Sequence, residues 1–423
     1  MRPERFVTMV VDGEVGPDAA RLARELERLG VVTTTLVAGG GLGGLATLRR
    51  ALRGAEVVHA YGLRAALAVG LARPGRTPFV VSLAEAPPVA GSLVTRAIHR
   101  AVFPAAAAVL VPTPALVAPV TQLGVREVRV LPPPLPNPLV GQRTPEQVRE
   151  ELALSPDGPI VLAAGRLHPD TRLDVLVEAA ARWRPRHPRP QVVLVGVGPA
   201  YRPLVAQATV ARAPVTFAGD RVLVEASAER PAADGRAAAG PVTDRTAGES
   251  GDVVTITGRS RRGADGAAGR GEGPVTPYAV EGEQPDSEVA EEERASLSDL
   301  LAAASVAVVT DPWAQPGFAL AAARLGVALV VAEGGTVAEL FPEGAVTVPP
   351  GDPDALDAAV AALLDDAQAR GDLAAAARRH VADWPDAAAV AGELAALYAT
   401  VAEAEVGGSA STAGAAEASD TPG

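Results

Sequence analysis

Residues 305–335 read SVAVVTDPWAQPGFALAAARLGVALVVAEGG and contain the repeating unit of the fold. A short Val-rich strand leads into a turn with Pro and Gly, a helix of small residues follows, and a second apolar strand closes the unit. Buried strands on either side of a helix are typical of a parallel sheet in an α/β protein. A turn of this kind before a helix is also a common phosphate-binding element, because the first N–H groups of a helix lack partners within it.

The same alternation of strands and helices runs through both halves of the chain. RFVTMVVD is followed by the helical pattern DAARLARELERLG near the start, and PIVLAAG is followed by LDVLVEAAARW in the second half. Between the halves lies PPPLPNPLVGQRT at 132–144, a Pro cluster that neither a helix nor a strand tolerates. The sequence therefore predicts an N-terminal domain at 1–135, a linker at 136–150 and a C-terminal domain at 151–402, each with a doubly wound sheet.

Two segments depart from this pattern. Residues 221–293 are rich in Gly, Ala, Arg, Asp and Glu and have few large apolar side chains, and residues 403–423 are similar. Such segments bury too little apolar surface to offset the entropy of ordering, so we expect both to be disordered. Within the first, RVLVEA and DVVTITGR alternate as strands do and are predicted to pair as a small hairpin.

Composition excludes several classes of function. The 423 residues include no Cys and carry a formal charge of −12, which argues against thiolate chemistry, Cys-bound zinc and nucleic-acid binding. The N-terminus lacks the apolar core of a signal peptide, and we expect a soluble cytoplasmic protein. Contact with the inner face of the membrane stays open, and SLVTRAIHRAVF at 92–103 is its candidate surface.

Four motifs, in chain order, carry a family resemblance. They are GRLHPDTRLDVLVEAAARW, VVLVGVGPAYRPL, LLAAASVAVVTD and PPGDPDALDAAVAALL. Together they resemble the GT-B glycosyltransferases, and among them the retaining family 4. The resemblance implies two Rossmann-like domains facing a cleft, with a nucleotide-diphospho-sugar on the C-terminal domain. It implies an acceptor, lipid-linked in many members, approached from the N-terminal domain. We expect no cofactor and no metal site.

The resemblance also implies which cations would stabilise the nucleotide diphosphate as it leaves. In the family an Arg and a Lys of the GRL element do so; Arg166 keeps the first position after Gly165, whereas Thr171 stands at the second, followed by Arg172. We predict Arg166 and Arg172 as the catalytic residues, although Arg172 is equally consistent with a solvated cation at a helix start. His168 is a weaker candidate in the same loop.

The family's pair of carboxylates, spaced E-x7-E, is replaced in this chain. Matching GVALVVAEGGTVAEL to the family pattern without a gap places Trp313 and Ala321 at the two acidic positions. Trp313 is predicted either to stack on a base or sugar or to fill a gap in the core. Asp311 is the nearest substitute acid, or only caps the turn.

Backbone groups remain available at this turn. The N–H groups of Gly317, Phe318 and Ala319 are expected to open a helix toward the donor phosphates. In the N-terminal domain, Gly13 and Gly16 are predicted to let the backbone approach the ligand closely.

The N-terminal domain has also lost a family residue. The family's active-site His falls on Ala84, and Glu85 is the ionisable residue that follows it. His59, in EVVHAYG, matches a His of the family pattern, but a lone His at a strand end is more often structural than catalytic.

These observations favour a glycosyltransferase that uses a nucleotide sugar. The alternative is a catalytically inactive pseudo-glycosyltransferase that serves as a nucleotide-binding or scaffold module, and the replaced acids favour it. An epimerase or hydrolase on the same fold is a third hypothesis. The sugar, the base and the acceptor are not specified by the sequence.

Overall fold

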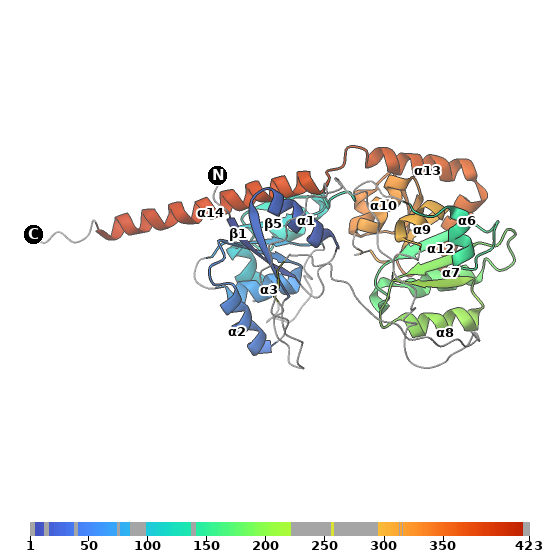
Figure 1. The fold of residues 1–423 in the computed structure, drawn as a ribbon, viewed down its shortest axis with the longest axis horizontal. Coiled ribbons are helices and arrows are strands. Elements are labelled where there is room, and N and C mark those ends of the chain that lie inside the picture. Colours follow the sequence, from blue (N-terminus) through green and yellow to red (C-terminus); the bar gives the residue numbers. More distant parts are fainter. Residues whose placement is uncertain are drawn as a thin grey trace, which may run out of the picture.

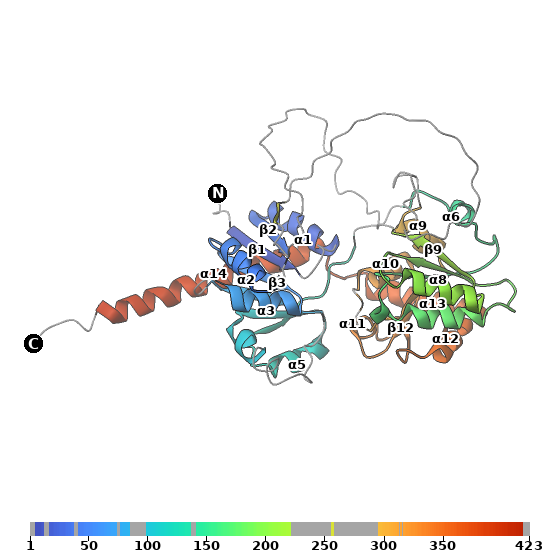
Figure 2. The same ribbon diagram turned by 90° about the horizontal axis from the view of Figure 1, so that it is seen from below.

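The computed structural model describes residues 5–11, 17–37, 41–73, 77–84, 99–136, 141–220, 255–257, 295–312, 314 and 316–417. Two α/β domains lie side by side, as Figures 1 and 2 show, and the long C-terminal helix lies along the N-terminal domain and extends beyond it. The predicted fold class, two doubly wound domains, is therefore confirmed.

The N-terminal domain is built on a seven-stranded sheet in the order β10-β2-β1-β3-β4-β5-β6. All neighbours pair in parallel except β10 (Thr255–Thr257), which comes from the insertion and is antiparallel to β2. Its elements are β1 (Arg5–Val11), α1 (Pro17–Arg28), β2 (Val31–Val37), α2 (Gly41–Ala51), β3 (Val57–Tyr61), α3 (Leu63–Ala72), β4 (Phe79–Ser82), η1 (Phe103–Ala105), β5 (Ala108–Val111), η2 (Pro114–Leu116), α5 (Val117–Thr121) and β6 (Val128–Val130).

The C-terminal domain is built on a six-stranded parallel sheet in the order β13-β12-β11-β7-β8-β9. Its elements are α6 (Pro145–Glu151), β7 (Ile160–Ala164), η3 (Pro169–Thr171), α7 (Leu173–Ala181), β8 (Gln191–Val195), α8 (Tyr201–Ala211), β9 (Val215–Gly219), α9 (Leu297–Ala303), β11 (Val306–Val309), α10 (Gly317–Leu325), β12 (Ala328–Ala332), α11 (Thr336–Leu340), β13 (Ala345–Val348), α12 (Pro353–Asp365) and α13 (Ala367–His380). Strands β11 and β12 are buried along their whole length, which explains why they read as continuous apolar runs.

The last helix, α14 (Ala387–Glu417), returns to the N-terminal domain. Its buried face packs with α1 and the sheet through side chains at helical spacing, which are Val390, Ala391, Leu394, Leu397, Tyr398 and Val401. The prediction that residues up to 402 belong to the C-terminal domain is wrong for this helix, and so is the prediction of a tail disordered from residue 403, because the helix runs to Glu417. An 18-residue window, Ala387–Ala404, is apolar enough to cross a membrane by length and composition. Of this window 39% is buried in the structure, on the face that packs against the N-terminal core.

A buried hydrogen bond fastens α14 to the sheet. Nδ1 of His59 on β3 lies 2.5 Å from Oη of Tyr398, and both side chains are fully buried. The Tyr398→Phe variant is expected to unfold with a free energy lower by about 1–3 kcal/mol, because it leaves a ring nitrogen of His59 buried without this partner. Urea denaturation measures the change. Thr400→Ala on the exposed side of the same helix is the control, and an equal loss in both variants would contradict the role of Tyr398.

The predicted linker at 136–150 is also shorter than expected. Residues 145–150 belong to α6, which Thr144 and Gln147 cap reciprocally: the Gln147 amide N–H donates to Oγ1 of Thr144, and the Thr144 N–H donates to Oε1 of Gln147. Pro145 at the first helical position completes a helix-start signal that the surrounding prolines obscured.

The predicted hairpin within 221–293 stays a prediction, because only three of its residues are described. Thr255–Thr257 form β10, which pairs with Thr34–Leu36 of β2 in the other domain, at an edge that would otherwise be open. The remaining residues of the insertion, RVLVEA included, lie outside the described residues.

Candidate functional site

The strand order of each sheet indicates where a ligand would bind. In the C-terminal domain the order reverses between β7 and β11, and in the N-terminal domain it reverses between β1 and β3. Doubly wound sheets bind ligands at such switch points, outside the carboxyl ends of the strands. The loops concerned are 165–172 after β7 and 310–316 after β11, and these are the loops that carry the predicted donor-site residues.

Two hydrogen bonds join the carboxyl-end loops of the two domains. Thr336 Oγ1 at the start of α11 donates to the carbonyl oxygen of Ala84, which follows β4, at 2.7 Å. Thr113 Oγ1, after β5, donates to Oε2 of Glu339 at 2.5 Å. These bonds hold α11 against the carboxyl-end loops of the N-terminal domain. Sequence reasoning missed both threonines, since only the domain arrangement brings them to these partners.

The GRL loop is held by the loop that follows β8. The Leu167 N–H donates to the Val197 carbonyl at 2.9 Å, and the Ala200 N–H donates to the Leu167 carbonyl at 2.9 Å. A Cβ at Gly196 would overlap the Gly165 carbonyl, and one at Gly198 would lie 2.9 Å from the Leu167 carbonyl carbon. Both glycines have positive φ, at 134° and 151°, so only glycine allows this close stacking.

The two predicted catalytic arginines differ in their surroundings. Arg166 is exposed, and within the described part of the chain its guanidinium makes no hydrogen bond or ion pair. The guanidinium of Arg172 lies against Gly351, and its Nε is 3.5 Å from a carboxylate oxygen of Asp174. Of the two, Arg166 is therefore the one whose cation is available to a phosphate.

The backbone at Arg172 explains part of this difference. Arg172 adopts the left-handed conformation, with φ 54° and ψ 31°, which glycine adopts more readily than other residues. A non-glycine residue costs energy there, so the neighbouring contacts must hold it in place. Thr171 contributes to this, because Thr310 Oγ1 donates to its carbonyl at 2.6 Å and fixes the GRL loop to the end of β11.

The start of α10 presents backbone donors, as predicted. Pro316 is the N-cap, so Gly317, Phe318 and Ala319 are the first helical residues and their N–H groups have no partner within the helix. Pro316 itself has no N–H to contribute. This terminus suits an anion, because the helix dipole adds to the unpaired donors.

The positions where the family has acidic residues, and the nearby Asp311, offer less to a ligand. Ala321 is fully buried in the apolar core beneath α10, so its side chain has no surface to offer a ligand. Asp311 is half-buried in the turn, where its carbonyl accepts a hydrogen bond from the Ala314 N–H. Trp313 lies outside the described residues, and so do Gly13, Gly16 and Glu85, so their predicted roles stay predictions.

His59 contributes to the fold. Burial lowers its pKa to about 3, so the ring is neutral, and its Nε2 lies 2.8 Å from Oγ of Ser82 while Nδ1 is engaged by Tyr398. A ring with both nitrogens bonded and no exposed surface is not placed to act on a substrate in a cleft. His168 accepts a hydrogen bond from the Asp170 N–H at 3.3 Å and is one-third exposed.

Among the described residues, no group of three or more His, Asp or Glu side chains is placed to hold a metal ion. The expectation of a metal-free donor site stays a prediction.

Comparison with known proteins agrees with this geometry. Residues 6–135 match the family described as glycosyl transferase 4-like domain. No curated protein sequence matches the chain.

Solved structures resemble the fold over nearly the whole chain. HepE of Anabaena, in complex with UDP and glucose, superposes with a TM-score of 0.63 at 16% identity, covering 94% of this chain and 100% of HepE. Sucrose-phosphate synthase of Thermosynechococcus elongatus gives 0.64 at 16% identity, covering 95% and 100%. WaaG, a glycosyltransferase of lipopolysaccharide biosynthesis, gives 0.57 at 14% identity, covering 93% and 99%. The chain thus has the GT-B fold, and its residues 6–135 match the glycosyl transferase 4-like domain.

Proposed function

We propose that the chain transfers a sugar from a nucleotide-diphospho-sugar to an acceptor, with retention of the anomeric configuration. The observation that carries the proposal is Arg166 on the loop after β7, whose guanidinium has no partner among the described residues. It lies at the switch point that also receives the N-terminus of α10. Each is suited to negative charge on a diphosphate. The UDP and glucose bound by HepE make UDP the first nucleotide to test.

The protein would act mainly by stabilising the nucleoside diphosphate as it leaves. As the glycosidic bond to the diphosphate breaks, charge develops on the phosphate oxygens, and a fixed guanidinium and fixed N–H groups stabilise it without reorganising. The stacked loops of Gly165–Leu167 and Gly196–Gly198 would hold Arg166 in position while this happens. The proposal needs no cofactor and places the reaction in the cytoplasm, at the membrane face if the acceptor is lipid-linked.

The second candidate is a pseudo-glycosyltransferase that binds a nucleotide without turnover. Ala321 stands buried where the family has a ribose-binding acid, and Arg172 is engaged by Asp174. Both changes take away charged groups that the resemblance implies at the donor site, so they favour a protein that does not turn over the nucleotide sugar.

Calorimetric titration with UDP, GDP and ADP tests nucleotide binding, which both candidate functions require. Arg166→Ala is expected to weaken binding of the preferred nucleotide by roughly tenfold to a hundredfold, the worth of a lost charge-assisted hydrogen bond. Arg184→Ala is the control, because Arg184 is exposed away from the switch point and is unpaired among the described residues. Unchanged affinity in Arg166→Ala, or no nucleotide bound at millimolar concentration, rules out the proposed donor site.

Turnover separates the two candidates. Incubation with the nucleotide sugar that matches the preferred nucleotide is expected to release nucleoside diphosphate slowly, with water as the acceptor, and Arg166→Ala is expected to lose that release. Tight nucleotide binding with no release in the unmodified protein supports the scaffold.

A further inference from the structure

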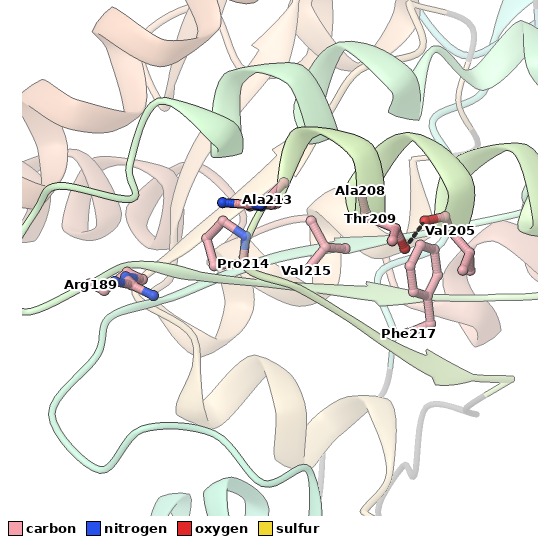
Figure 3. A pocket seen from close by; sticks show the side chains of 9 residues that line it. Arg189, Val205, Ala208, Thr209, Ala213, Pro214, Val215 and Phe217 are labelled. Atoms are coloured by element: carbon pink, nitrogen blue, oxygen red, sulfur yellow. Dashed lines mark hydrogen bonds between the residues drawn. The ribbon is translucent and has the colours of Figure 1, made fainter. Parts of the chain in front are cut away.

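A hollow of about 400 Å³ lies on the C-terminal domain at the edge of the sheet opposite to the candidate cleft. It is bounded by the start of β9, the C-terminal half of α8 and the loop before β8, and Figure 3 shows Arg189 at one end of the row of lining side chains and Phe217 at the other. The residues that line it are Arg189, Val205, Ala208, Thr209, Arg212, Ala213, Pro214, Val215 and Phe217. Because β8 and β9 start here, a ligand in this hollow would be separate from one at the carboxyl ends of the strands.

The floor of the hollow is apolar and incompletely covered. Val215 and Phe217 point from β9 toward α8, since alternate residues of a strand share a face, yet both remain partly exposed beside the core of the domain. Phe217 also meets the Tyr201 ring edge to face at 5.4 Å, which fixes its orientation. A half-open apolar floor of this kind fits the flat face of a ring.

The rim of the hollow is cationic. Arg189 and Arg212 are the ionisable residues among those that line it, and neither makes an ion pair or side-chain hydrogen bond within the described part of the chain. In the segment before β8, Arg182 pairs with Asp354 at 2.5 Å and Arg186 pairs with Asp365, whereas Arg184 has no partner among the described residues. The two positive charges at the hollow therefore lack a described counter-charge in a protein whose net charge is −12.

The backbone at Arg212 supports a specific use of this side chain. Arg212 ends α8 in the left-handed conformation, with φ 50° and ψ 37°. Glycine is the residue usually found in that conformation at a helix end, because it adopts it without strain. The chain instead keeps an arginine there, and its side chain lines the hollow.

We infer that this hollow binds a phosphomonoester carried on a planar apolar ring. Two guanidinium groups match the charge of −1.5 to −2 on a phosphomonoester better than the single charge of a carboxylate. The ring rests on Val215 and Phe217, and the volume is at the lower end of the range for small-molecule sites. The site is separate from the nucleotide-sugar cleft and does not depend on the proposed function.

Phenyl phosphate is the probe, and ligand-observed NMR on the full chain is the measurement. Binding is expected in the millimolar range or tighter, with inorganic phosphate and glucose 6-phosphate weaker by about tenfold because they lack the apolar ring. The double variant Arg189→Gln/Arg212→Gln is expected to weaken phenyl phosphate binding by at least about tenfold. Arg184→Gln, on the same loop as Arg189 but outside the hollow, is expected to leave it unchanged.

Further variants keep the result interpretable. Arg212→Gly suits the left-handed backbone, so it removes one cation with the helix end intact and is expected to weaken binding as well. Arg166→Ala is expected to bind the probe as the unmodified protein does, which separates this hollow from the cleft. The inference is overturned by no binding at about 5 mM probe, by undiminished binding in the double variant, by equal affinity for glucose 6-phosphate, or by loss of binding in Arg166→Ala.

Discussion

Gly196→Ala is expected to lower the free energy of unfolding by about 3 kcal/mol, from a strained backbone and a steric overlap together. The added methyl group would meet the Gly165 carbonyl, and φ at this position is 134°, which L-residues rarely adopt. The loops after β7 and β8 would have to separate, and Arg166 would move with them. Nucleotide affinity is therefore expected to fall along with stability.

Urea denaturation and nucleotide titration measure the two effects on the same sample. Gly371→Ala is the matched control, because Gly371 lies within α13 and an added Cβ would meet nothing within 4 Å. That substitution is expected to stabilise the protein by about 0.5–1 kcal/mol, as an alanine does within a helix. A Gly196→Ala protein as stable as the parent would show that the two loops are not stacked as described.

Asp299→Ala is expected to lower the free energy of unfolding by about 3–4 kcal/mol, because it removes the acceptor of four hydrogen bonds. Asp299 is 1% exposed. Its Oδ1 accepts from the N–H groups of Gln142 and Arg143 at 2.6 and 2.9 Å, and its Oδ2 accepts from the N–H and hydroxyl of Ser296 at 2.8 and 2.7 Å. One carboxylate thus caps α9 and fastens the end of the interdomain linker to it.

Thermal and urea denaturation measure the loss. Asp366→Ala is the control, since Asp366 is an exposed N-cap of α13 and its removal is expected to cost only about 1 kcal/mol. Equal losses of stability in the two variants would show that the buried Asp299 contributes no more than an exposed helix cap does.

The same carboxylate predicts how stability depends on pH. Burial would raise the pKa of Asp299, but the hydrogen bonds from Ser296, Arg143 and Gln142 outweigh it and leave the pKa below its usual value. A lowered pKa stabilises the fold above the unfolded-state pKa, near 3.9, and that contribution is lost as the pH falls through the folded-state pKa. The parent protein should therefore lose more stability than Asp299→Asn on acidification below about pH 4.

Local patterns in the sequence predicted most of the fold. The Val-rich runs became strands because each is buried between helices, and the Pro cluster at 132–136 lies between the two sheets. The pairing of Thr255–Thr257 with β2, more than two hundred residues away, was not predicted. No local pattern identifies a partner at that distance.

The candidate site was predicted less completely. The position of Arg166 and the open N-terminus of α10 follow from motif spacing. Two other features depend on contacts between distant segments and could not be predicted. The guanidinium of Arg172 packs against Gly351, and the ring of His59 is buried against Tyr398. The close stacking of Gly196 on Gly165 had a signal in the sequence, since the paired glycines of VGVG follow a buried strand.

The return of α14 to the N-terminal domain has a consequence for biosynthesis. The core around β1, β3 and α1 is completed by side chains from Val390 to Val401, which the ribosome adds after almost the whole of the other domain. Until then the nascent N-terminal domain exposes the apolar groove that α14 will fill, together with Nδ1 of His59, which lacks its partner Tyr398. A ribosome stalled before residue 387 should therefore hold a first domain that chaperones bind and proteases cut, although every strand of its parallel sheet has already been made.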